Sequence, residues 1–146
     1  MSVYIPVVLR QQIRDQFAHC CAYCQTAEQL TVAIFEIEHI MPLVAGGDTV
    51  VDNLCLACPT CNRYKATQLT AVDPQTGDSA PLFHPQQQVW TDHFSWNDSH
   101  TELVGLTTSG RATIETLRMN RPQLVRVRRM WVKLGEHPPA TMRNDE

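Results

Sequence analysis

The chain has 146 residues, of which 43% are hydrophobic and 18% are charged. This composition fits one globular domain, or a small core with an appended lobe, and excludes a disordered chain, a collagen-like chain and a coiled-coil rod. No apolar run approaches the roughly 20 residues that a membrane helix needs. The N-terminus also lacks the basic start and long apolar stretch of a signal peptide. We therefore expect a cytoplasmic protein that does not enter a membrane.

The formal net charge is −3 and the sequence pI is about 6.0. This average argues mildly against a nucleic-acid partner, which usually favours a basic protein. The charge is unevenly distributed, however, because residues 111–133 hold seven basic residues and one acidic residue. The location of a basic patch matters more than the total charge, so the composition leaves a nucleic-acid partner open.

Periodicity and turn residues predict both helices and strands in the first half of the chain. Apolar residues near helical spacing predict a short amphipathic helix over 7–18, and alternation predicts a strand over 32–39. A Gly-Gly turn marks 40–53 as a loop. A second short strand is expected over 54–57, followed by a helix over about 59–67 with a proline in its first turn.

The second half of the chain predicts a connector and then two strands and two helices. Residues 72–89 are rich in turn formers and are expected to form the connector. A strand is expected over 90–97, and after an Asn-Asp-Ser turn a returning strand over 102–106. Two helices are expected over 109–119 and 122–134. Together these elements predict the α+β class.

Six cysteines are present, and because nothing indicates secretion we expect them to remain reduced. Four of them form two C-x-x-C pairs, Cys21 with Cys24 and Cys58 with Cys61. Each pair places two thiolates on one side of a tight turn, and two such pairs complete the tetrahedral geometry of structural zinc. We therefore predict a structural Zn²⁺ site at these four cysteines.

The two remaining cysteines are less suited to bind the metal than the four in these pairs. Cys20 has the wrong spacing to Cys24. Cys55 and Cys58 also form a C-x-x-C pair, but a strand through them would point the two side chains to opposite faces. Cys55 is therefore interpreted as a small buried apolar residue. His19 could replace a cysteine ligand, and the preferred interpretation is a flanking, solvated histidine.

A dense motif lies between the cysteine pairs and continues through the second pair. Residues 36–47 are Glu-Ile-Glu-His-Ile-Met-Pro-Leu-Val-Ala-Gly-Gly, and residues 52–65 begin with Asp-Asn-Leu and end with Cys-Asn-Arg-Tyr-Lys. In this order of residues the chain closely resembles the HNH endonuclease family. The three signature positions are His39, Asn53 and Asn62, which makes the chain an H-N-N variant.

The resemblance covers residues 20–66 most strongly and implies both a fold and an activity. The implied fold is a ββα-metal, treble-clef-like core over residues 1–70, joined by the zinc site. A C-terminal α+β extension over residues 71–146 is expected to pack on this core as one compact unit. The implied activity is hydrolysis of DNA phosphodiester bonds with a single Mg²⁺-type ion, leaving 5′-phosphate and 3′-hydroxyl ends.

The resemblance also assigns roles that make chemical sense. It implies that His39 is the general base, and an imidazole that titrates near neutrality can take a proton from water at physiological pH. It implies that Glu38 and the amide oxygen of Asn62 bind the catalytic metal, since hard cations prefer oxygen ligands. An asparagine in place of a histidine favours Mg²⁺ or Mn²⁺ over a catalytic Zn²⁺. Asn53 resembles the family residue that holds the loop after the first strand by hydrogen bonds.

The identity of the metal-binding carboxylate stays open. The family often has an aspartate immediately before the histidine, whereas this chain has Glu38. Glu36 lies on the same face of the predicted strand and is the alternative ligand. Glu38 is preferred because it occupies the family position and because a Mg²⁺ site usually takes only one or two carboxylates.

Several basic residues are candidates for contact with substrate phosphates. Lys65 lies three residues after Asn62 on the same helix face, and a solvated lysine is the alternative. Arg126, Arg128 and Arg129 belong to the basic segment and could form a phosphate-contacting surface. The alternative is a solvated helix face.

The sequence thus predicts a divalent-metal-dependent HNH endonuclease that acts on DNA. RNA stays open as a substrate, and nothing in the sequence indicates an oligomeric state. The first alternative is a zinc-bearing module that binds nucleic acid or protein without catalysis. The second alternative is a thiol-redox protein built on the C-x-x-C pairs.

Overall fold

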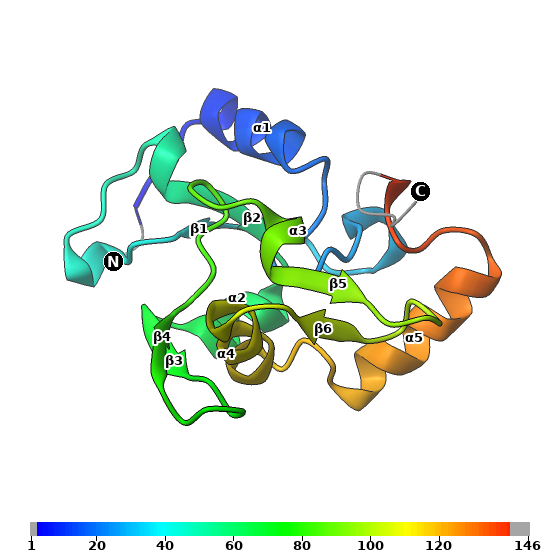
Figure 1. Cartoon of the computed structure of the whole chain (residues 1–146). Coiled ribbons are helices and arrows are strands. Elements are labelled where there is room, and N and C mark those ends of the chain that lie inside the picture. Colours follow the sequence, from blue (N-terminus) through cyan, green and yellow to red (C-terminus); the bar gives the residue numbers. More distant parts are fainter. Residues whose placement is uncertain (1–2, 141–146) are drawn as a thin grey trace.

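The computed structural model describes residues 3–140, so residues 141–146 of the predicted extension lie outside it. Its helices are α1 (Val7–Gln16), α2 (Pro59–Lys65), α3 (Trp90–His93), α4 (Thr108–Leu117) and α5 (Pro122–Lys133). Its strands are β1 (Glu36–His39), β2 (Leu54–Ala57), β3 (Thr70–Val72), β4 (Ser79–Pro81), β5 (Phe94–Trp96) and β6 (Leu103–Gly105). They form the antiparallel pairs β1–β2, β3–β4 and β5–β6 (Figure 1). This mixture of helices and small sheets confirms the α+β class.

The two predicted core strands pair and lead directly into helix α2. His39 lies opposite Leu54, and Glu36 lies opposite Ala57. All four residues of β2 are buried, because α1 and β1 both contact this strand. Pro59 occupies the first turn of α2, where its missing N–H leaves no hydrogen bond unmade. Helix α2 ends at Lys65 rather than at residue 67, since Ala66 takes a positive φ of 51°.

Strand β1 begins at Glu36, four residues later than the predicted start. The backbone of Phe35 is already bonded to side chains: its N–H donates to Glu28, and its carbonyl accepts from Arg14. Its partner across the sheet would be Cys58, which instead caps α2. Residues 32–35 therefore have no strand to pair with.

The prediction of an irregular connector over 72–89 is wrong in part, because the segment contributes to the hairpin β3–β4. The Asp73 carboxylate accepts from the backbone N–H of Gln75 and the hydroxyl of Thr76. The same carboxylate forms an ion pair with Arg111 of α4 at 2.9 Å. Strands of three residues are too short to show an alternation of apolar and polar residues in the sequence. Tertiary contacts therefore determine whether this hairpin forms.

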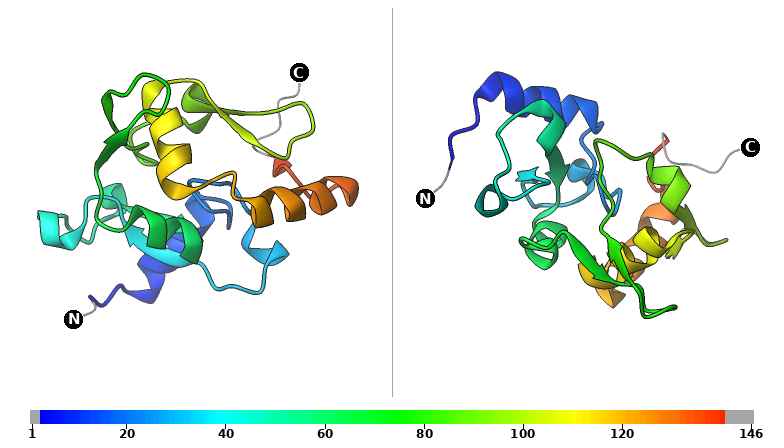
Figure 2. Two further views of the ribbon diagram at one scale, coloured as in Figure 1. Left: turned by 90° about the horizontal axis from the view of Figure 1, so that it is seen from below. Right: turned by 60° about the vertical axis from the view of Figure 1, so that its left-hand side comes forward.

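The strand predicted over 90–97 is also shorter than expected. Residues Trp90–His93 form the single helical turn α3, and the strand β5 follows it. The returning strand, β6, and helix α5 lie within the predicted ranges, and α4 begins one residue before its predicted range. Helices α2 and α4 pack against each other, which brings the extension onto the first part of the chain (Figure 2).

One hydrophobic cluster contains residues from both parts of the chain. The first part contributes Ile13, Tyr23, Phe35, Ile40, Leu54 and Leu56, and the extension contributes Phe83, Trp90, Phe94, Trp96, Leu117 and Leu124. The indole N–H of Trp90 donates to the carbonyl oxygen of Tyr23 at 2.9 Å. Within residues 3–140, no helix has the length and apolar character needed to cross a membrane.

Candidate metal centre and active site

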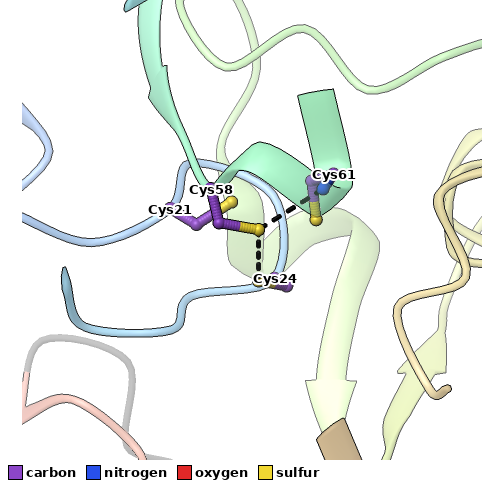
Figure 3. Close-up of side chains that lie close together, drawn as sticks. All are labelled: Cys21, Cys24, Cys58 and Cys61. Atoms are coloured by element: carbon purple, nitrogen blue, oxygen red, sulfur yellow. Dashed lines mark hydrogen bonds between the residues drawn. The ribbon is translucent and has the colours of Figure 1, made fainter. Parts of the chain in front are cut away.

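Four cysteines gather where the two C-x-x-C pairs meet (Figure 3). All four are buried, and their sulfur atoms lie within 4.8 Å of one another. The Sγ atoms of Cys24 and Cys58 are 3.9 Å apart, which matches the roughly 3.8 Å edge of a tetrahedron with Zn–S bonds of about 2.3 Å. Cys21, Cys24, Cys58 and Cys61 are therefore positioned to bind a metal ion, and four thiolates suggest zinc.

The local backbone explains why these sulfur atoms converge. Cys58 is the N-cap of α2, and its Sγ accepts a hydrogen bond from the N–H of Cys61 at 3.4 Å. Burial raises the pKa of the Cys21 thiol, whereas hydrogen bonds from the other three cysteines hold the pKa of Cys24 below its usual value. Four buried thiolates without a cation would repel one another, so this donor set fits a bound divalent metal.

The other candidate ligands lie outside the cluster. Cys55 is buried on β2, where its thiol contacts Glu38 Oε1 at 3.2 Å. Burial raises the pKa of Cys55, and the nearby Glu38 raises it further. His19 has a half-exposed side chain and pairs with Asp15 instead.

His39 lies at the end of β1 with its side chain partly exposed. Its Nε2 atom is 2.9 Å from the hydroxyl oxygen of Thr49, in the loop between β1 and β2. Partial burial lowers the pKa of His39, although the adjacent Glu38 opposes this effect. A lowered pKa keeps the imidazole neutral over more of the physiological range, and only the neutral ring can accept a proton.

Asn53 holds this loop against the end of β1. Its Oδ1 accepts from the N–H of Met41 at 2.7 Å, and its Nδ2 donates to the carbonyl oxygens of Met41 and Asp48. These three hydrogen bonds tie the loop between β1 and β2 to the backbone that follows β1. Gly47 is needed at this point, because a Cβ there would lie only 1.9 Å from the Met41 carbonyl oxygen.

Asn62 reaches from α2 to β1, and its partner there is Glu36. The Nδ2 of Asn62 donates to Oε1 of Glu36 at 2.6 Å. Glu36 is exposed and Asn62 is partly exposed, so solvent and solutes can reach the pair. Of the two carboxylates considered in the sequence analysis, Glu36 is thus the one that contacts Asn62.

Glu38, the preferred carboxylate, is engaged elsewhere. Its side chain is 5% exposed, and Oε2 lies 2.9 Å from the ammonium of Lys65. Its Oε1 accepts hydrogen bonds from Tyr23 at 2.7 Å and from Cys55 at 3.2 Å. The expectation that Glu38 joins Asn62 at a metal is therefore corrected, because these buried partners already occupy its carboxylate.

Two of the predicted phosphate contacts also need correction. Lys65 is 2% exposed and Arg128 is fully buried, so neither side chain can meet a phosphate in this structure. Arg128 faces the interior of the extension, where it donates to the carbonyl oxygens of Thr101 and Met119. Arg126 and Arg129 lie on the exposed side of α5.

Tyr23 also belongs to the surroundings of His39, although the sequence pattern did not predict it there. This residue lies between Cys21 and Cys24, and its hydroxyl reaches the neighbour of His39. A tyrosine inside a metal-binding turn was the available signal, but its partner lies 15 residues away on β1.

Residues 21–68 match the family model described as HNH endonuclease. The matched segment contains the four clustered cysteines together with His39, Asn53 and Asn62. This match and the metal-binding cluster identify an HNH endonuclease domain at residues 21–68. No curated protein and no solved structure matches the chain.

Proposed function

We propose that the protein is a divalent-metal-dependent HNH endonuclease that hydrolyses DNA phosphodiester bonds. The observation that supports this most is the 2.6 Å contact between Glu36 of β1 and Asn62 of α2. It places a solvent-accessible carboxylate and a side-chain amide together at the start of β1, the short strand that ends at His39. The match of residues 21–68 to the HNH endonuclease model supports the same class of reaction.

The donor set at Glu36 and Asn62 fits a Mg²⁺ or Mn²⁺ ion. Such ions prefer carboxylate and amide oxygens and keep several waters. A half-turn of the Asn62 amide exchanges Nδ2 for Oδ1, and this choice follows the hydrogen-bond partner present. The pair can therefore offer two oxygens to a cation. When bound, such an ion supplies positive charge that stabilises the phosphate in the transition state.

His39 would act as the general base of this reaction. If Nε2–H donates to the Thr49 hydroxyl, Nδ1 carries the free lone pair and can accept a proton from water. The resulting hydroxide attacks the phosphorus, the bond to the 3′ oxygen breaks, and that oxygen takes a proton from solvent. The products are a 5′-phosphate and a 3′-hydroxyl. Asn53 holds Asp48, the neighbour of Thr49, and so fixes the orientation of the base.

Arg126 and Arg129 are proposed as phosphate contacts outside the reacting centre. Both are exposed on α5 and carry charge of the sign that DNA requires. They would position the substrate without specifying its sequence.

A plasmid-cleavage assay tests the proposal against its main alternative. Purified protein is incubated with supercoiled DNA in Mg²⁺, in Mn²⁺ or in EDTA, with linear DNA, single-stranded DNA and RNA in parallel. A nuclease converts the supercoiled form only when Mg²⁺ or Mn²⁺ is present. Binding without cleavage under every condition would favour an inactive zinc-bearing module.

A zinc determination distinguishes the nuclease proposal from the remaining alternative, a thiol-redox protein. A thiol-redox protein cycles its cysteines between dithiol and disulfide, whereas the four clustered thiols here form one ligand set. One tightly bound zinc per chain, without disulfide reductase activity, excludes the redox function.

A further inference from the structure

Beneath His39 lies a buried polar network made of Tyr23, Glu38, Cys55 and Lys65. Every member is at most 5% exposed. The carboxylate of Glu38 is its centre: Tyr23 and Cys55 donate to Oε1, and Lys65 lies 2.9 Å from Oε2. Oε2 has no hydrogen-bond partner among the described residues, so the ion pair with the Lys65 ammonium alone compensates the charge of this oxygen.

Lys65 contacts the chain on both sides of His39. Its ammonium lies 2.9 Å from the side chain of Glu38, the residue before His39. It also donates at 3.0 Å to the backbone carbonyl of Ile40, the residue after His39. Because Lys65 follows Asn62 by three residues on α2, a single helix holds both the backbone of the base and the amide of the candidate metal site.

Tyr23 joins this network to the metal-binding cysteines and to the extension. It lies in the turn between Cys21 and Cys24, two of the four clustered cysteines, so its position depends on the shape of that turn. Its hydroxyl donates to Glu38 at 2.7 Å, and its carbonyl accepts from Trp90. The zinc site and the end of β1 are thus connected through two side chains.

The energetics argue that this network has a role beyond stability. Taking a carboxylate and an ammonium out of water is costly, and an apolar pair of similar volume is often as stable or more so. A buried pair is therefore weak evidence for stability, but it does define the relative positions of the groups that it joins. Here those groups are β1 at His39 and α2 at Asn62.

We propose that Lys65 is a positioning residue for His39, coupled through Glu38 and Tyr23 to the zinc-binding turn. This proposal rests on the proposed nuclease function of His39. It assigns Lys65 neither to the substrate phosphate nor to the metal, and it assigns Glu38 to Lys65 rather than to the catalytic ion.

Three roles predict three different kinetic results for Lys65→Met, which keeps the length of the side chain and removes the charge. A positioning role predicts that kcat falls by about 100-fold, since misplacing a reacting group by about 1 Å has effects of this size. The half-saturating Mg²⁺ concentration and the Kd for DNA then stay unchanged. A phosphate contact predicts a raised Kd, and loss of a metal ligand predicts a raised Mg²⁺ requirement. Either of those results with a near-normal kcat would overturn the proposal.

The double variant Glu38→Gln with Lys65→Met separates positioning from mere stability. It removes both buried charges, and the Gln oxygen can still accept from Tyr23, so thermal stability should recover relative to Lys65→Met. The kcat should stay low, because the Ile40 carbonyl still lacks its partner. Recovery of kcat together with stability would show that only charge balance matters, and would overturn the proposal.

Two further variants keep the test decisive if Lys65→Met does not fold. Lys133→Met is a matched control, since Lys133 is exposed at the end of α5 and should keep wild-type kcat. Tyr23→Phe removes one neutral hydrogen bond to Glu38, and we expect kcat to fall by about two- to tenfold with one zinc still bound. An unchanged kcat in folded Tyr23→Phe would overturn the coupling to the zinc-binding turn.

A measurement that does not depend on cleavage distinguishes this proposal from the nuclease function. The ring nitrogen signals of His39 in an NMR spectrum report its bond to Thr49. Lys65→Met should shift them and Lys133→Met should not. If the wild-type protein cleaves nothing, the nuclease proposal fails, but a shift specific to Lys65→Met still supports positioning. Identical His39 signals in folded Lys65→Met and wild-type protein would overturn it.

Discussion

Arg128 belongs to the basic segment, but its side chain lies in the interior of the protein. It donates to the carbonyl oxygens of Thr101 and Met119, and its guanidinium lies 5.1 Å from the ring centre of Trp96. Burial lowers its pKa to about 10, so the group remains charged at neutral pH. Among the neighbouring arginines, Arg126 and Arg129 instead face solvent.

We therefore expect Arg128→Ala to lower the free energy of unfolding by about 2–4 kcal/mol, because it leaves buried carbonyl oxygens without a donor. Urea denaturation followed by tryptophan fluorescence measures this change. Arg126→Ala and Arg129→Ala are the controls and should each stay within about 0.5 kcal/mol of wild type. Equal effects at all three positions would contradict the buried role of Arg128.

His137 predicts a dependence of stability on pH. Burial, and then the charge of Arg128, lower the pKa of His137 to about 4, against about 6.5 in the unfolded chain. Above pH 6.5 both states are neutral and the stability is fully present. As the pH falls from 6.5 through 4, the unfolded state binds the proton first, so folding becomes less favourable.

Unfolding of wild type and His137→Phe at pH 7 and pH 5 tests this, since phenylalanine keeps a ring against Trp96. The variant should lose less stability between the two pH values than wild type does. Zinc release in acid affects both proteins, so the difference between them isolates His137. A parallel loss in the two proteins would show that His137 does not titrate as described.

The sequence alone could not determine whether Glu36 or Glu38 is the candidate metal ligand. Both side chains lie on the same face of β1, two residues apart, and both are glutamates. What separates them is Lys65, whose ammonium reaches only one of the two carboxylates. That contact depends on where α2 crosses the sheet, which spacing does not specify.

At the scale of elements, the two cysteine pairs join the segment after α1 to the start of α2. Cys58 belongs to the metal cluster and also caps α2, whereas Cys55 is buried on β2 and contacts Glu38. The binding free energy of a structural metal is also folding free energy. Loss of a ligand should therefore appear in stability and metal content together.

We expect Cys58→Ser to lower both the zinc content and the thermal stability, and Cys55→Ser to leave the zinc content at one ion per chain. Metal analysis of the purified proteins and their melting temperatures provide the measurements. The ligand assignment fails if Cys55→Ser loses zinc while Cys58→Ser retains it.

Elements with strong local signals were predicted well. Helix α5 has a proline in its first turn and clear apolar spacing, and α2 begins at a proline after a capping cysteine. The hairpin β3–β4 and the helical turn α3 were not predicted, because their formation depends on contacts with residues that are distant in the sequence. Asp73 needs Arg111, and Trp90 needs the carbonyl of Tyr23.

At the scale of the whole molecule, the extension completes the core of the first part. Trp90 and Phe94 belong to the same hydrophobic cluster as Tyr23 and Leu54. The side chain of Gln86 also donates to the carbonyl of Leu54, directly opposite His39 in the sheet. Removing the extension would expose this apolar surface to water.

A fragment of residues 1–70 should therefore lack cooperative unfolding, even with zinc present. Circular dichroism during urea titration tests this, with the full chain as the control. A sigmoidal transition in the zinc-loaded fragment would show instead that the first part folds alone.

The central claim is that His39 takes the proton from the attacking water while Glu36 and Asn62 hold the metal ion. The rate of plasmid cleavage as a function of Mg²⁺ concentration tests it most directly, in wild type, His39→Ala and Glu36→Ala. We expect His39→Ala to lose about 10²–10⁴-fold in kcat at every Mg²⁺ concentration, as for the loss of a general base. Glu36→Ala should need more Mg²⁺ and recover part of its rate when the ion is in excess. A fully active His39→Ala protein would contradict the account.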